Sequence, residues 1–163
     1  VRAAWLYLQV NGTTIDDVYE ARLIIEPAAA GRAAARAGKK GTSRLRQLLT
    51  AEEDVDDDPV GWAHAAVRFH EAVVDLAGLQ TLNLFAGMLS EIIDRHQVAE
   101  VSRAGGENIE NRRHADRAHS KLLTLIEAGD TEGAEALWRS HIFETNKRYA
   151  KTAGGMPVID LFD

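Results

Sequence analysis

The chain has 163 residues, no cysteine and a formal net charge of -6 from 19 Lys+Arg and 25 Asp+Glu. This length suits one domain with a sizeable core. The lack of cysteine excludes disulfides, thiolate metal sites and thiol catalysis. No apolar run reaches the roughly 20 residues that cross a bilayer, and no secretory signal pattern opens the chain. We therefore expect a cytoplasmic protein with no membrane contact, and the absence of a basic stripe argues against nucleic-acid binding by this chain itself.

Apolar residues recur with helical spacing almost throughout, and Ala, Leu, Arg and Glu dominate, so we expect an all-α fold. Residues 1–13 are expected to be a linker or the remnant of a truncated N-terminal region. We expect one domain over residues 14–153 and an irregular tail over 154–163. The helices are predicted over about 14–38, from about 42 into the acidic run 52–58, and over about 59–78, 81–104, 108–128 and 131–150, with glycine breaks at Gly78, Gly105-Gly106 and Gly129.

Three of the six histidines fall on the apolar stripe of a predicted helix. A lone buried histidine is usually a neutral side chain with one hydrogen-bond partner. Three buried imidazoles on three helices each need a partner, however, and few acidic residues share their stripes. Either each histidine has a structural partner or the three share one divalent metal ion. The stripes are His70 with Ala66, Val73, Val74 and Ala77, His119 with Leu122, Leu123 and Ile126, and His141 with Ala134, Leu137 and Trp138.

The other histidines and one arginine complete the set of candidates. His96 continues a helical stripe of apolar residues, and we expect it to line a cavity shared with the three buried histidines. His64 and His114 lie off the stripes and are expected at the surface. Arg22 lies one helical turn before Glu26. On a surface this pair would contribute only a few tenths of a kcal/mol, but an Arg22 that faced the interior would suit a carboxylate ligand, because its planar fork donates two parallel hydrogen bonds.

Three stretches resemble the FCD domain, the effector-binding C-terminal domain of FadR-type GntR transcription regulators. They are VYEARLIIEPAAAGRAA, RFHEAVVDLAG and AHSKLLTLIEAGDTEGAEALWRSHI, and the resemblance covers about Ile15 to Ala150. Its most specific element places His119 and His141 eleven residues on either side of Asp130. The resemblance implies an antiparallel bundle of about six or seven helices that encloses a ligand and metal cavity.

The resemblance also implies site residues. Many members of the family bind a divalent metal ion through one Asp and three His, and the histidines correspond to His70, His119 and His141. The Asp position is Ala66 in this sequence, which leaves three histidines with open coordination positions for zinc, nickel or manganese. Arg22 lies within a pattern of the family. We therefore expect Arg22 and His96 to bind the effector, and we expect the effector to be a small carboxylate.

These features predict an effector-sensing domain and not an enzyme. In the family a winged helix-turn-helix domain precedes the bundle, so we expect a fragment of a longer homodimeric regulator in which that N-terminal domain binds operator DNA. A metal-dependent hydrolase or hydratase with a three-histidine site is the alternative. It needs a general acid or base, for which the sequence offers His96 or Glu71. A third possibility is a dimerisation bundle with structural histidines, which requires a filled core.

Overall fold

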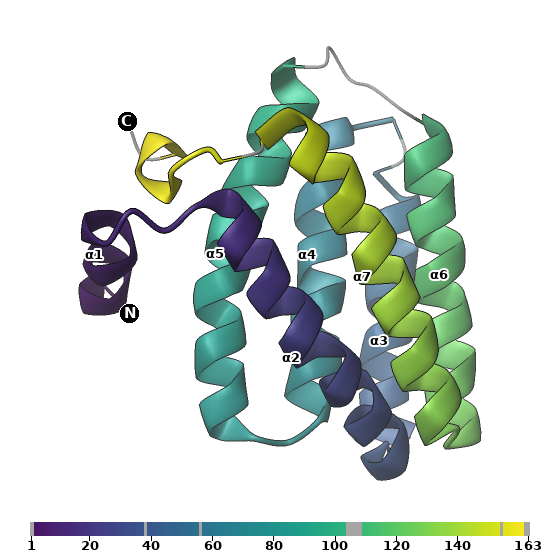
Figure 1. The fold of residues 1–163 in the computed structure, drawn as a ribbon. Coiled ribbons are helices and arrows are strands. Elements are labelled where there is room, and N and C mark those ends of the chain that lie inside the picture. The colour runs from purple at the N-terminus through teal and green to yellow at the C-terminus, as the bar shows by residue number, and fades with distance from the viewer. Residues whose placement is uncertain (1, 38, 56, 104–108, 154, 162–163) are drawn as a thin grey trace.

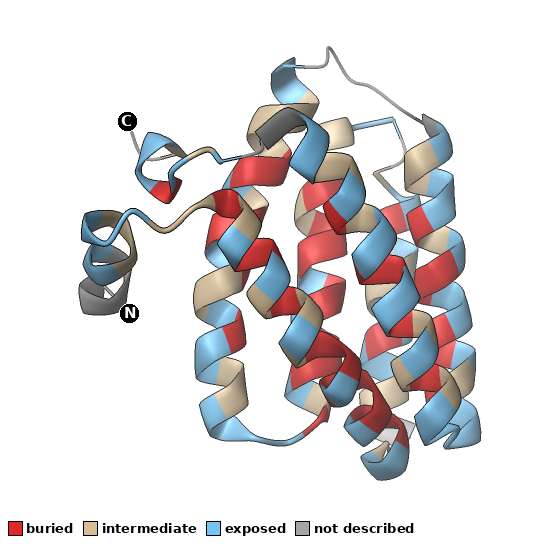
Figure 2. Cartoon of the chain, in the orientation of Figure 1, coloured by how far each residue is buried: buried red, intermediate tan, exposed pale blue. Residues whose placement is uncertain are grey.

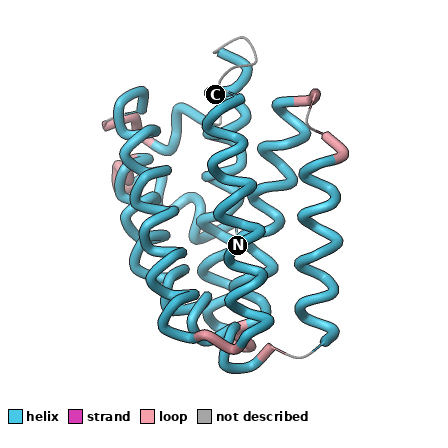
Figure 3. Tube along the Cα trace, turned by 90° about the vertical axis from the view of Figure 1, so that its right-hand side faces the viewer, coloured by secondary structure: helices cyan, strands magenta, loops and turns pink. Residues whose placement is uncertain are grey.

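The computed structural model describes residues 2–37, 39–55, 57–103, 109–153 and 155–161. Within them, helices α2 to α7 run side by side as a bundle (Figure 1), and short loops join them in the described part (Figure 3). The all-α prediction is confirmed. In chain order the elements are α1 (Arg2–Val10), α2 (Ile15–Arg36), α3 (Lys39–Glu53), α4 (Pro59–Leu76), α5 (Gln80–Arg103), α6 (Ile109–Ala128), α7 (Thr131–Ala153) and the short 3-10 helix η1 (Val158–Leu161).

Local signals explain most helix ends. Thr14 is the N-cap of α2 and accepts a hydrogen bond from the Asp17 N–H at 3.3 Å. Asp58 caps α4 in the same way, and Pro59 occupies the first turn, where its missing N–H costs nothing. Gly78 follows α4 with φ of 73°, a left-handed conformation that favours glycine. The predicted break at Gly105-Gly106 lies outside the described residues, and α3 begins three residues before the expected start.

Helix α2 is central to the bundle, since it packs against α4, α5, α6 and α7. Small side chains permit this close packing: Ala30 and Ala33 are fully buried, and a Cβ added at Gly31 would lie only 3.1 Å from the Thr131 carbonyl oxygen of α7. Buried residues accordingly follow the inward helix faces (Figure 2). The polar residues on this buried face of α2 must therefore find partners inside the protein.

The two ends of the chain contain more regular structure than the sequence indicated. Residues 1–13 include α1, which lies apart from the bundle beside η1 (Figure 1). The tail includes η1, and its backbone pairs with the start of α2: the Ile15 N–H donates to the Met156 carbonyl and the Val158 N–H to the Thr13 carbonyl, both at 2.9 Å. The prediction of an irregular tail is wrong for this segment, because those backbone hydrogen bonds and the buried Val158 fix it. No described helix is both long and apolar enough to span a bilayer.

Candidate metal and effector site

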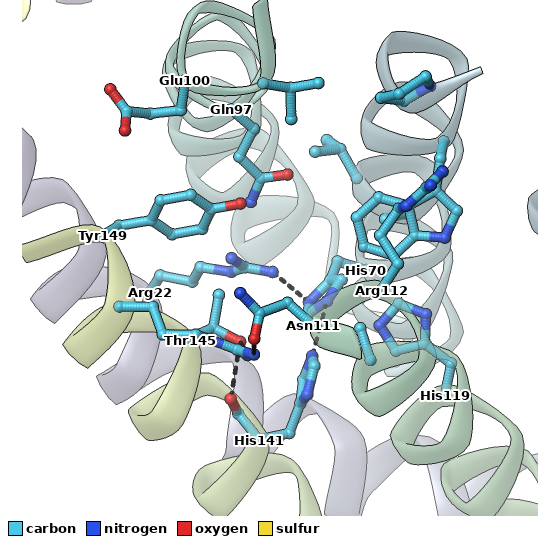
Figure 4. A pocket seen from close by; sticks show the side chains of 17 residues that line it. Arg22, His70, Gln97, Glu100, Asn111, Arg112, His119, His141, Thr145 and Tyr149 are labelled. Carbon is cyan, nitrogen blue, oxygen red and sulfur yellow. Dashed lines mark hydrogen bonds between the residues drawn. The ribbon is translucent and has the colours of Figure 1, made fainter. Parts of the chain in front are cut away.

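The three predicted histidine stripes converge at one point in the bundle. His70 comes from α4, His119 from α6 and His141 from α7, and all three are at least 95% buried. Each offers a ring nitrogen within 4.8 Å of the others, and the Nε2 atoms of His70 and His141 lie 3.4 Å apart. Figure 4 shows the three rings gathered at one end of a cavity. Residues 71 positions apart in the chain are thus placed for a common ligand.

Two buried glutamates orient two of these rings. His119 Nδ1 lies 2.9 and 3.0 Å from the carboxylate oxygens of Glu52, and His70 Nδ1 lies 2.6 Å from Glu26 Oε2. Each contact occupies Nδ1 and leaves Nε2 for another partner. His119 Nε2 is buried and has no hydrogen-bond partner among the described residues. A carboxylate behind the ring and an unused nitrogen in front is the usual arrangement of a metal-binding histidine.

Glu26 is the centre of a charged network beneath His70. Its Oε1 accepts from Arg22 Nε at 2.8 Å, and its Oε2 accepts from Trp138 Nε1 at 3.0 Å. Arg22 Nη2 also lies 2.5 Å from His70 Nδ1. We assign the Nδ1 proton to the bond with Glu26, because an ionised carboxylate can only accept. Burial raises the pKa of Glu26, but the charge of Arg22 and the contacts with His70 outweigh it and hold the pKa at about 2.

The histidines are neutral at neutral pH. Burial lowers the pKa of His70 and of His119 to about 3, and burial together with the two neighbouring histidines holds the pKa of His141 well below its usual value. Burial and the charge of Glu53 raise the pKa of Glu52 to about 8. A cation near His119 would favour the ionised form of Glu52. Neutral imidazoles are the form that binds metal ions.

The donor set fits one divalent metal ion. Zinc–nitrogen bonds of about 2.0–2.1 Å in a tetrahedral site place ligand nitrogens about 3.3 Å apart, close to the 3.4 Å between His70 and His141. Aromatic side chains hold the rings in place: Trp138 lies 4.3 to 5.5 Å from all three ring centroids, and Phe69 stacks on His119 at 4.6 Å. A divalent ion held by these three histidines would keep coordination positions free for other ligands.

The cavity has a volume of about 250 Å³. Arg22 faces it and is only 3% exposed, and its Nη1 has no hydrogen-bond partner among the described residues. Ala66 also lines it, at the position where the resemblance implies an Asp. The full lining consists of Arg22, Pro59, Trp62, Ala66, Val67, His70, Gln97, Glu100, Val101, Asn111, Arg112, Ala115, His119, His141, Thr145, Arg148 and Tyr149.

Four of the five candidate site residues therefore line one cavity, but His96 does not. Its Nδ1 lies 3.0 Å from the Tyr19 hydroxyl, and its ring packs against Tyr149 at 5.4 Å. Tyr149 and Gln97 line the cavity instead, so the expectation that His96 lines it is not met. His64 and His114 are off the site as expected: His64 pairs with Asp94 at 2.7 Å, and His114 is exposed.

Sequence reasoning missed both glutamates. Glu52 belongs to the acidic run 52–58, yet it is only 2% exposed. A signal was present, because Glu52 lies seven residues after the buried Leu45 and so shares the apolar stripe of α3. Glu26 was noted only as a partner of Arg22. Its bonds to His70 and Trp138 cross between helices and leave no local pattern.

The FCD domain model matches residues 17–144. The chain therefore belongs to the FCD domain family, the effector-binding domains of GntR-type transcription regulators. Comparison with curated proteins gave no match, and neither did comparison with solved structures. The matched range contains Arg22 and the three clustered histidines.

Proposed function

We propose that this chain senses a small organic acid, which binds at a divalent metal ion held by His70, His119 and His141. The observation that carries the proposal is the convergence of three neutral imidazoles with the Arg22 guanidinium on one internal cavity. A bound divalent ion would supply open coordination positions, which carboxylate oxygens suit. The metal is zinc, nickel or manganese, since imidazole ligands accept each of them.

Arg22 is the proposed anchor for the carboxylate. Glu26 holds its Nε at 2.8 Å and so fixes the orientation of the guanidinium. Its Nη1 remains without a described partner and is a buried donor that an anionic oxygen would satisfy. The cavity, at about 250 Å³, is smaller than the roughly 300–1,000 Å³ of pockets for drug-sized ligands. The effector is therefore a small molecule.

Effector binding is proposed to act through helix packing. The cavity wall is drawn from α2, α4, α5, α6 and α7, so one ligand contacts helices from most of the bundle. The ligand shifts a conformational equilibrium only by its different affinity for the two states. In the intact regulator, proposed to be a homodimer, the change in packing would reposition N-terminal winged helix-turn-helix domains on operator DNA.

The site offers less support for the two alternatives. A hydrolase needs a general acid or base, but Glu71 is exposed and His96 lies outside the cavity. Among the described lining residues the only carboxylate is Glu100, which pairs with Arg103. A dimerisation bundle with structural histidines requires a filled core, and the cavity beside the histidines does not match that requirement.

The test combines metal analysis with calorimetry. Wild type, Arg22→Lys and His119→Ala are stripped of metal, reloaded with zinc, nickel or manganese, dialysed and analysed for metal content. Mono-, di- and tricarboxylates are then titrated into each protein. Arg22→Lys should keep its metal and bind carboxylates at least about tenfold more weakly, because it loses the bidentate fork. His119→Ala should lose metal and carboxylate binding together.

A matched control is Arg36→Lys, an exposed position on the same helix that does not line the cavity. It should behave as wild type. The sensor proposal fails if no carboxylate binds the metal-loaded wild type, or if one carboxylate binds all four proteins equally.

A further inference from the structure

We propose that the effector is a short-chain dicarboxylate whose second carboxylate binds Arg148 of α7. The proposal rests on the function proposed above, which assigns the first carboxylate to Arg22 and the metal. It adds a second anion site within the same cavity and so restricts the chemical class of the effector.

Arg148 is a half-buried cation held by neutral groups. It lines the cavity, and its Nη1 and Nη2 donate to Asn111 Oδ1 at 3.0 Å and to Thr145 Oγ1 at 3.2 Å. Within the part of the chain that the structure describes, Arg148 forms no ion pair with a carboxylate. Two of the five N–H donors of a guanidinium are thus used to orient it, and the rest remain for an anion. A carboxylate would supply the missing counter-charge.

Arg148 lies close enough to the proposed metal ligand His141 for a short effector to reach both. Thr145 donates to the His141 carbonyl at 2.9 Å, and Arg148 reaches back along α7 to Thr145, so its head group lies about one to two turns from His141, roughly 5–10 Å along the axis. In Figure 4, Asn111 and Thr145 lie between Arg22 and His141.

The rest of the cavity matches the same ligand. Among the described lining residues the charged side chains are Arg22, Arg112, Arg148 and Glu100, and the carboxylate of Glu100 is paired with Arg103. The carboxylate of Glu26 forms an ion pair with Arg22 and compensates its charge. Arg148 therefore adds to the cavity a positive charge that no carboxylate of the described residues neutralises, and the apolar side chains Trp62, Val67 and Ala115 form a wall for the carbon chain that joins two carboxylates.

The experiment compares ligands that differ by one charge. Succinate, malate and glutarate are titrated calorimetrically into metal-loaded wild type, together with the monocarboxylates of equal chain length, butyrate, 2-hydroxybutyrate and pentanoate. At least one dicarboxylate should bind ten or more times more tightly than its monocarboxylate. Arg148→Gln, which keeps a hydrogen-bonding side chain without the charge, should remove that preference while metal content and monocarboxylate affinity stay unchanged. Circular dichroism verifies that the variant is folded.

Arg139→Gln is the matched control, because Arg139 is on the same helix but pairs with Glu135 at the surface. It should retain the preference for the dicarboxylate. If both members of every pair bind wild type equally, or if Arg148→Gln keeps the preference, the second anion site is refuted while the sensor function stands. If neither member of any pair binds, the second anion site is refuted, and the proposed function fails as well when no carboxylate of the wider screen binds.

Discussion

Replacement of His119 by alanine tests the metal site and the contact between His119 and Glu52 together. The imidazole is 1% exposed, stacks on Phe69 at 4.6 Å and holds Glu52. Its truncation leaves a cavity, which for large buried side chains costs about 2–5 kcal/mol. It also leaves the buried Glu52 carboxyl without its partner, at about 1–3 kcal/mol. The metal-free variant should therefore lose about 3–8 kcal/mol of the roughly 5–15 kcal/mol typical of a domain.

Metal adds a second, separable effect. Ligand at a thousandfold excess over its dissociation constant stabilises the native state by about 4 kcal/mol. Urea denaturation of wild type, followed by circular dichroism, should show a gain of this order on addition of zinc, nickel or manganese. The His119→Ala protein should show little gain, and elemental analysis should find its metal content greatly reduced.

Two further variants identify the cause. His114→Ala alters an exposed histidine on the same helix, so its stability should stay within about 0.5 kcal/mol of wild type and its metal response should be intact. The double variant His119→Ala/Glu52→Leu should be about 1–3 kcal/mol more stable than His119→Ala alone, because no buried carboxyl is left unpaired. Equal metal content and equal metal-dependent stabilisation in wild type and His119→Ala would refute the three-histidine site. A double variant no more stable than the single one would refute the role given to Glu52.

Ala66 and Glu52 provide two more tests. Ala66→Asp places a carboxylate in the cavity one turn before His70 and should tighten metal binding at least about tenfold in a chelator competition. Ala66→Asn should give a smaller effect. Unchanged metal affinity in a folded variant would mean that another group fills that position. The second test compares metal-free wild type with metal-free Glu52→Gln. In the wild type, burial and the charge of Glu53 raise the pKa of Glu52 from 4.5 to about 8, so the folded protein holds a proton that the unfolded chain releases. Wild-type stability relative to the variant should therefore fall as pH rises from about 5 to 8, by up to about 1.4 kcal/mol per pH unit. A difference in urea stability that does not vary with pH would contradict this assignment.

The sequence by itself determined the helices and the faces of the three key histidines. A helix repeats every 3.6 residues, so the apolar neighbours of His70, His119 and His141 predicted burial without knowledge of the fold. Caps such as Thr14 and Asp58 are equally local, because the side chain bonds to backbone within three residues. The FCD resemblance then predicted that the histidines share a cavity, and the structure places them together.

Only the tertiary structure decided which partners these residues have. Glu52 meets His119 across 67 positions of the chain, and Glu26 meets His70 across 44. The packing of α5 put His96 behind Tyr149, and the packing of α7 turned Arg148 toward the cavity. The periodicity of apolar residues predicts that a side chain faces inward. It does not predict which helix that side chain contacts or how far along the bundle axis the contact lies. Those quantities depend on how whole helices fit together, and the close approach of α2 to its neighbours sets them through contacts that no local pattern contains.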